Sequence, residues 1–152
     1  MIFFGHKTVA WFDIWSLEHF MSGMSVGSLC VFLINHSLGS RDKRFVDDTL
    51  PTSIFVVYVM LLAFMWEPVE FYLEAGYTHI DRITNWFQGV EFWGNRLITD
   101  PGLTVAGALL QRKYKINVWY ARAFTLLWMI VNICVFPNSM WLQTWLQQQL
   151  AF

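Results

Sequence analysis

Long apolar runs separated by short polar segments dominate the chain. Three runs, at residues 15–37, 53–74 and 116–136, are each long enough to cross the hydrocarbon core of a bilayer, which takes roughly 20 helical residues. Glycine, proline and a cluster of charges separate the first run from the second, a composition typical of a solvated loop. The pattern therefore predicts three membrane-spanning helices.

A further span is predicted between the second and the last of these runs. Asp100 and Pro101 make a good helix start, with the aspartate as cap and the proline in the first turn. From Pro101 to the cations at 112–115, however, there is room for little more than half a bilayer. Either residues from about Glu91 join this helix through a kink, or the segment is a half-span.

Two amphipathic segments are expected to lie flat at the membrane surface. Apolar side chains recur at helical spacing over residues 80–93, and Trp141 and Trp145 stand one turn apart in the glutamine-rich tail that ends at Phe152. We therefore predict an all-α fold that forms one integral membrane domain over residues 1–152. It is a polytopic helical bundle of about four transmembrane helices, one short or kinked, with interfacial amphipathic helices.

The composition supports a membrane environment. Apolar residues make up 56% of the chain and charged residues only 14%, whereas about a quarter of a soluble domain is charged. A formal net charge of −1 provides no basic surface for nucleic acid. Membrane lipids are the expected partners, together with other membrane subunits or a second copy of the chain.

The distribution of cations predicts the orientation. With four crossings, six cations lie on one side of the membrane and three on the other, which places both chain ends outside. In a bacterial inner membrane this would be the periplasmic side. The inner cations are Arg41, Lys43, Arg44, Arg112, Lys113 and Lys115, and the outer ones are Lys7, Arg82 and Arg96.

The same topology brings polar residues from three spans to one depth near the outer surface. They belong to the start of the first span, the end of the second and the start of the 91–115 segment. In chain order they are Glu18, His19, Glu67, Glu70, Glu74, Glu91, Asn95, Arg96 and Asp100. We expect them to form one acidic pocket that also contains a histidine.

Helical spacing indicates which residues share a face. Glu67, Glu70 and Glu74 follow at i, i+3 and i+7, and Glu91 and Asn95 at i and i+4, so each set can point inward together. His19 shares its face with two glycines that permit close packing of another helix. Those glycines are Gly23 and Gly27, and the opposing surface would be the side of Gly102, Ala106 or Gly107.

A buried acidic cluster needs compensation, because each carboxylate at the centre of a span costs about 2.5–3.5 kcal/mol on insertion scales. Three interpretations are open: a divalent metal ion, a proton relay, and pairing with Arg82, Arg96 and His19. The metal interpretation would use His19, Glu67, Glu70, Glu91 and Asp100 as ligands, with support from Glu18, Glu74, Asn95 and Arg96. Arg96 and Asp100, at i and i+4, are also expected to pair.

The order of these polar residues resembles that of small VanZ-like and related uncharacterised bacterial membrane proteins. The resemblance covers residues 11–110 and includes the run Gly107-Ala108-Leu109-Leu110 at its end. It implies a four- or five-helix envelope protein that acts near lipid-linked or glycopeptide-related components, with no catalytic chemistry to transfer. The matching positions are His19, Glu67, Glu70, Asn95 and Asp100.

Two functions from different classes follow from the sequence. In the first, the acidic pocket binds a metal ion or a lipid headgroup, with or without catalysis. In the second, the protein is a non-catalytic accessory subunit of a larger bioenergetic or transport complex, for which its small size and glycine packing motifs are suited. A cation or proton pathway is a third possibility.

Overall fold

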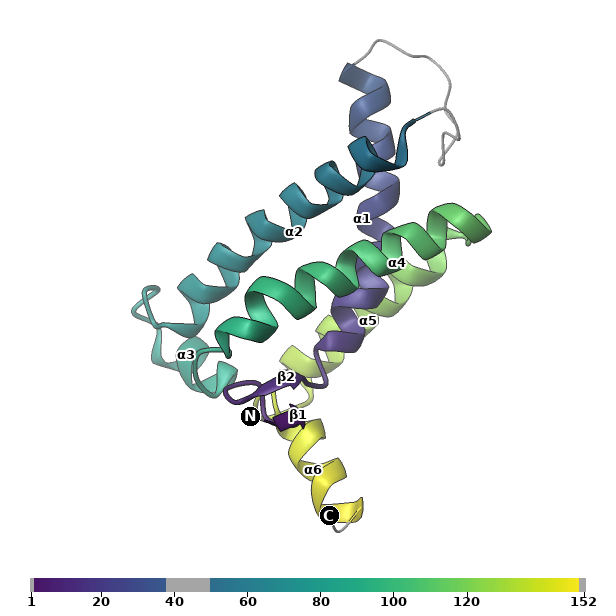
Figure 1. Ribbon diagram of the computed structural model, residues 1–152. Coiled ribbons are helices and arrows are strands. Elements are labelled where there is room, and N and C mark those ends of the chain that lie inside the picture. The colour runs from purple at the N-terminus through teal and green to yellow at the C-terminus, as the bar shows by residue number, and fades with distance from the viewer. Residues whose placement is uncertain (1, 38–49, 151–152) are drawn as a thin grey trace.

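The computed structural model describes residues 2–37 and 50–150 of the chain (Figure 1). The described part is helical apart from one pair of three-residue strands, which confirms the predicted all-α class. In chain order the elements are β1 (Ile2–Phe4), β2 (Ala10–Phe12), α1 (Ser16–Ser37), α2 (Thr52–Glu74), α3 (Asp81–Phe87), the π-helix η1 (Asn95–Thr99), α4 (Asp100–Tyr114), α5 (Val118–Cys134) and α6 (Trp141–Leu150). The predicted loop cations Arg41, Lys43 and Arg44 lie outside the described residues.

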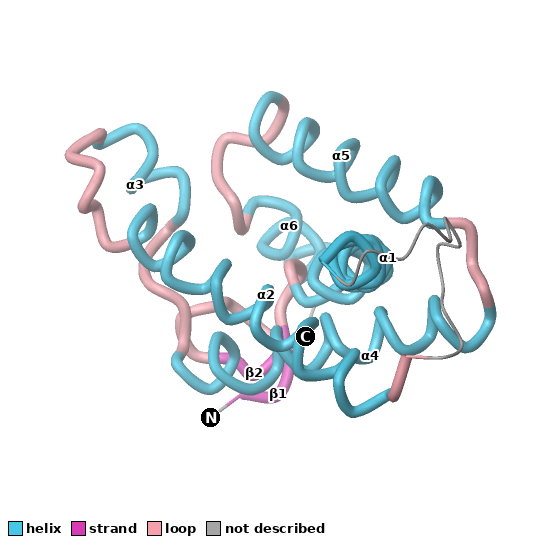
Figure 2. The backbone as a smooth tube through the Cα atoms, turned by 90° about the horizontal axis from the view of Figure 1, so that it is seen from above, coloured by secondary structure: helices cyan, strands magenta, loops and turns pink. Residues whose placement is uncertain are grey.

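Helix α1 is the central element of the bundle. It contacts α2, α4 and α5, and when it is viewed end-on in Figure 2 these three helices lie around it. Successive long helices run in opposite directions, so the start of α1, the end of α2, the start of α4 and the end of α5 lie at one end of the molecule (Figure 1). Both termini lie at this same end, as the predicted alternation requires.

The three most apolar predicted segments are all helices. By length and composition α2 and the Ser16–Ile34 part of α1 are long enough to cross a membrane, whereas α5, with 17 residues, is apolar but shorter. Of the two segments predicted to be interfacial, 80–93 forms only the short α3, which ends at Phe87, and the tail forms α6. Helix α6 projects away from the bundle in Figure 1.

Helix α4 continues a helical segment that begins before it. The π-turn η1 leads directly into it, so the backbone is helical without interruption from Trp93 to Tyr114. Residues from Trp93 onward therefore join the helix, as one of the two interpretations of this segment expects, with a start two residues after Glu91. Helix α4 by itself has 15 residues, which span about 22 Å at about 1.5 Å per residue.

Close packing of α1 on α4 depends on glycine, as predicted for the small-residue face of α1. A Cβ atom at Gly23 would overlap the backbone of Thr104, and one at Gly107 would overlap the carbonyl of Phe20. The opposing surface was predicted less accurately. Gly107 belongs to it, but Gly102 and Ala106 are exposed on the outer side of α4.

The N-terminal hook, residues 2–12, is an element that the sequence pattern did not predict. Strands β1 and β2 pair in parallel, with Ile2 opposite Ala10 and Phe4 opposite Phe12. The turn between them holds Lys7, whose backbone carbonyl accepts a hydrogen bond from the Phe92 amide at 2.9 Å. The hook is thereby fixed to the segment that precedes η1.

Candidate functional site

The start of α1 is capped by Asp13. Its Oδ1 accepts hydrogen bonds from the backbone amides of Trp15 (2.7 Å) and Ser16 (3.1 Å), and the Ser16 hydroxyl accepts one from the Asp13 amide (3.1 Å). Such a reciprocal cap satisfies amides that the first helical turn leaves without partners. The cap also fixes the Asp13 carboxylate beside the polar residues of η1.

Glu74, at the end of α2, is the best-satisfied carboxylate of the site. It is 2% exposed, and its two oxygens accept from the Lys7 ammonium and the Arg96 guanidinium. The backbone amide of Glu91 donates a third hydrogen bond at 2.9 Å. Glu74 therefore joins α2 to the N-terminal hook and to η1.

Arg96 lies between three carboxylates. Besides its hydrogen bond to Glu74, its Nε is 3.7 Å from a Glu67 oxygen and 3.5 Å from a Glu91 oxygen. Neither of these two contacts is a hydrogen bond. The two oxygens, Oε2 of Glu67 and Oε2 of Glu91, are therefore buried without a hydrogen-bond donor. One guanidinium therefore contacts three carboxyl groups at once.

The predicted Arg96–Asp100 pair is wrong. The two residues are separated by a π-turn, in which the backbone bond joins residues five apart, so side chains four apart no longer lie above one another. Asp100 instead faces α1, with one carboxylate oxygen 3.3 Å from Nε2 of His19. Arg96 and His19 therefore both contact acids, as the pairing interpretation expects. Arg96 contacts Glu67, Glu74 and Glu91, and Asp100 contacts His19.

Asn95 connects two further carboxylates. It is fully buried, and its amide nitrogen donates to Glu91 at 2.7 Å and to Asp13 at 3.3 Å. Burial, with the nearby charges of Glu70, Asp13 and Glu74, raises the pKa of Glu91 to about 9. Burial likewise raises the pKa of Asp13 to about 6. At neutral pH Glu91 is therefore protonated, which removes one charge from the cluster.

A cavity of about 1280 Å³ opens beside this cluster. Its walls come mainly from α1, α2, α3 and α5, and most of the lining is apolar. The polar residues that line it are Lys7, Glu18, His19, Ser22, Glu67, Glu70, Arg82, Asn85, Gln88, Thr104 and Thr125. Most of the charged ones come from the cluster described above, so the cavity has a charged end and apolar walls.

Two of the carboxylates in the cavity lining have no partner among the residues that the structure describes. Glu18 is only 9% exposed, yet neither it nor Glu70 makes a hydrogen bond or ion pair with any described residue. The buried indole nitrogen of Trp86 and the hydroxyl of Thr125 also line the cavity without hydrogen-bond partners. A buried polar group without a partner costs roughly 1–3 kcal/mol, so these groups favour an occupant.

The predicted metal ligands are brought together only in part. Glu67 and Glu91 approach the same guanidinium, Glu70 lines the cavity, and Asp100 contacts His19. Across residues 2–37 and 50–150, no group of three or more His, Cys, Asp and Glu side chains could hold a metal ion. The guanidinium of Arg96, a cation of the protein itself, lies among the carboxyl groups of Glu67, Glu74 and Glu91.

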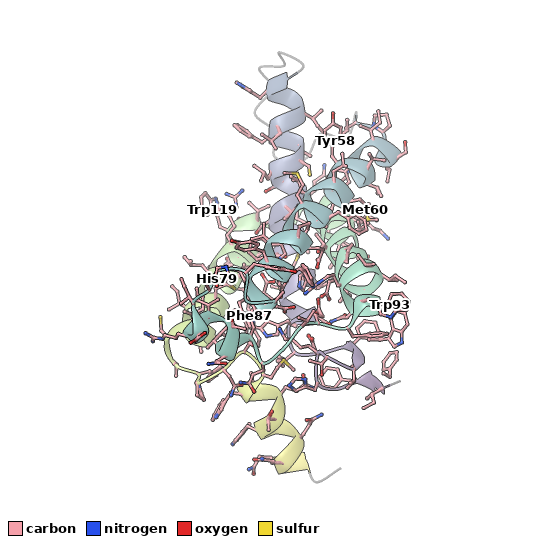
Figure 3. The ribbon with its side chains drawn as sticks, turned by 90° about the vertical axis from the view of Figure 1, so that its left-hand side faces the viewer. Tyr58, Met60, His79, Phe87, Trp93 and Trp119 are labelled. Atoms are coloured by element: carbon pink, nitrogen blue, oxygen red, sulfur yellow. The ribbon has the colours of Figure 1, made fainter. Side chains whose placement is uncertain are left out.

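The cations Lys7, Arg82 and Arg96 differ in burial and in their contacts with the acids. Lys7 was assigned only to the outer surface, but it is buried, binds Glu74 and lies 4.9 Å from the ring centre of Phe87, which is labelled in Figure 3. Arg82, expected as a pairing partner, is exposed at the cavity and forms no ion pair with a described residue. Of these three cations, Lys7 and Arg96 are buried in contact with the acids, whereas Arg82 is not.

Comparison of the chain with protein-family models, with curated proteins and with solved structures finds no match. The VanZ-like resemblance accordingly stays an expectation from the sequence.

Proposed function

We propose that the protein is an integral membrane protein whose cavity binds an amphiphile, with the headgroup at the acidic end and the chain along the apolar walls. Metal binding is the less well supported expectation, because a guanidinium already lies among the carboxylates. The observation that carries the proposal is the cavity itself, since it joins charged and apolar surface in one volume.

Membrane insertion is supported by the exposure of α2. This helix has the higher mean hydropathy of the two long apolar helices, 1.8, but only 22% of its most apolar window is buried. The core helix of a soluble protein would be covered by its neighbours, whereas a helix in contact with lipid need not be. Trp93 and Trp119, both labelled at the periphery of Figure 3, are likewise mostly exposed.

The placement of charge supports the orientation expected from the sequence. The acidic cluster and both termini occupy one end of the bundle, and the end of α4 with the turn to α5 occupies the other (Figure 1). Arg112 and Lys113 lie in the last turn of α4, and Lys115 follows it. Under the positive-inside rule the cavity's charged end belongs to the outer leaflet. An outer-leaflet lipid or a lipid-linked envelope component could enter between α2 and α5.

A matched pair of substitutions tests amphiphile binding. Leu29 lines the cavity, whereas Leu33, one turn further along α1 and equally exposed, does not. Leu29→Trp should narrow the cavity and lower the amount of lipid that remains bound after purification in mild detergent, and Leu33→Trp should leave it unchanged. Mass spectrometry of the intact complexes measures both. Equal lipid retention in wild type and both variants would contradict the proposal.

An accessory subunit is the second candidate function, and the outer face of α4 favours it. Gly102 and Ala106 are exposed at i and i+4, and a Cβ at Gly102 would meet no atom within 4 Å. Such a small-residue face suits close packing of a helix from another chain. Mass measurement after mild solubilisation from native membranes distinguishes the candidates, since a lone monomer counts against a subunit.

A further inference from the structure

We infer that the amphiphile bound in the cavity has a cationic headgroup, and more specifically a primary ammonium attached to a long alkyl chain. This inference rests on the proposed function and names its ligand class. It follows from the charge balance of the cluster, from the groups that face the cavity and from the aromatic residues beside them.

The cluster contains far more carboxyl groups than cations. Seven acids interact with one another there: Asp13, Glu18, Glu67, Glu70, Glu74, Glu91 and Asp100. The two buried cations, Lys7 and Arg96, both donate to Glu74. Protonation of Glu91 reduces the excess of negative charge, but Glu91 does not line the cavity.

Three of these carboxyl groups face the cavity. Glu18 is nine-tenths buried and has no hydrogen bond or ion pair within the described part of the chain, and the same is true of the less buried Glu70. Glu67 also lines the cavity, although its Oε2 lies 3.7 Å from Arg96 Nε. A primary ammonium has three N–H donors and no acceptor, so it can donate to the oxygens of three carboxyl groups at once.

Aromatic side chains also line the cavity. Trp15, Trp66 and Trp86 line it together with Phe87, and rings of this kind attract cations over their faces. Lys7 provides an example within the protein, since its ammonium binds a carboxylate of the cluster and lies 4.9 Å from the Phe87 ring centre. The remaining lining is apolar enough for an alkyl chain.

A titration with three chain-matched ligands tests the charge of the headgroup. The purified full-length protein in mild detergent is titrated with a long-chain primary amine, the corresponding alcohol and the corresponding carboxylic acid, and bound ligand is counted by native mass spectrometry. The amine should bind about tenfold more tightly than the alcohol, as a charge-assisted hydrogen bond predicts, and the acid should bind most weakly.

Substitutions attribute that preference to the cavity carboxylates. Glu18→Gln should reduce the preference for the amine about tenfold, and Glu70→Gln, at a more exposed position, provides the same test if the first variant does not fold. Asp81→Asn is the matched control, because Asp81 is an exposed acid outside the cavity lining. It should leave the preference unchanged.

Two negative outcomes are distinguishable. Saturable binding of amine and alcohol with equal affinity, lost in Leu29→Trp, would overturn the cationic headgroup and leave amphiphile binding intact. Failure of all three ligands to bind saturably, with no effect of Leu29→Trp on retained lipid, would overturn both the inference and the proposed function.

Discussion

Arg96 is the residue whose loss should cost the cluster most. It contacts three carboxyl groups, two from α2 and one from the loop before η1, and it is buried. Arg96→Met would leave buried charge uncompensated, which typically destabilises a protein by about 3–5 kcal/mol. Unfolding in detergent, followed by circular dichroism, measures the change. The control is Arg82→Met, which removes an exposed arginine and should change stability by less than about 0.5 kcal/mol.

Glu91 should make stability depend on pH. Its pKa is raised from 4.5 to about 9 in the folded protein, so the folded state retains a proton that the unfolded state has lost between these values. The stabilisation is complete below pH 4.5 and decreases as pH rises toward about 9. We expect the thermal midpoint of the wild type to fall over this range.

Glu91→Gln should flatten this pH dependence. The glutamine oxygen still accepts from Asn95, and no proton is lost as pH rises. The variant should therefore be more stable than the wild type near pH 9, while Asp81→Asn should follow the wild-type curve. Parallel curves for wild type and Glu91→Gln would show that Glu91 is ionised in the folded protein at neutral pH.

The sequence predicted most residues of the polar cluster, but it did not predict Asp13 and Lys7 as part of it. Glu18, Glu67 and Asn95 were predicted from their places in or near apolar segments, because an acid or amide is unusual there. Asp13 could have been found, since it stands three residues before Ser16 in a capping arrangement. Lys7 carries no local signal, because its burial depends on a turn fixed by distant residues.

Among the elements, α1 and α4 show how packing depends on single glycines. Gly23→Ala would drive a Cβ into the Thr104 backbone, an overpacking that costs about 1–3 kcal/mol. Gly102 is exposed on α4, and a Cβ atom there would meet no atom within 4 Å. Gly102→Ala should therefore stabilise α4 by up to about 1 kcal/mol through higher helix propensity. Thermal unfolding of both variants tests this, and destabilisation by both would mean that the α4 surface at Gly102 is covered.

The elements themselves were largely predictable from hydrophobic length. The runs at 15–37, 53–74 and 116–136 became α1, α2 and α5 within two residues at each end, because a long apolar run has few alternatives to a helix. The β1–β2 pair and η1 were not predicted. Three-residue strands and a single π-turn are determined by contacts with other segments, so periodicity does not report them.

For the whole molecule, antiparallel alternation of the helices was the prediction that mattered most. It correctly brought the end of α2, the segment before α4 and the start of α1 together, as the contacts of Glu74, Glu91 and His19 show. The cavity could not be predicted in the same way. Its existence depends on how far α2 and α5 stand apart around α1, which is a property of the assembled bundle.

The central claim is that this cavity holds an amphiphile with its head at the carboxylates. Electron cryo-microscopy of the protein in lipid nanodiscs tests it most directly. We predict a continuous chain-shaped density between α2 and α5 that ends at Glu18 and Glu67, at the depth of the outer leaflet. A bundle in which α2 packs directly against α5, with no space for a ligand between them, would contradict the account.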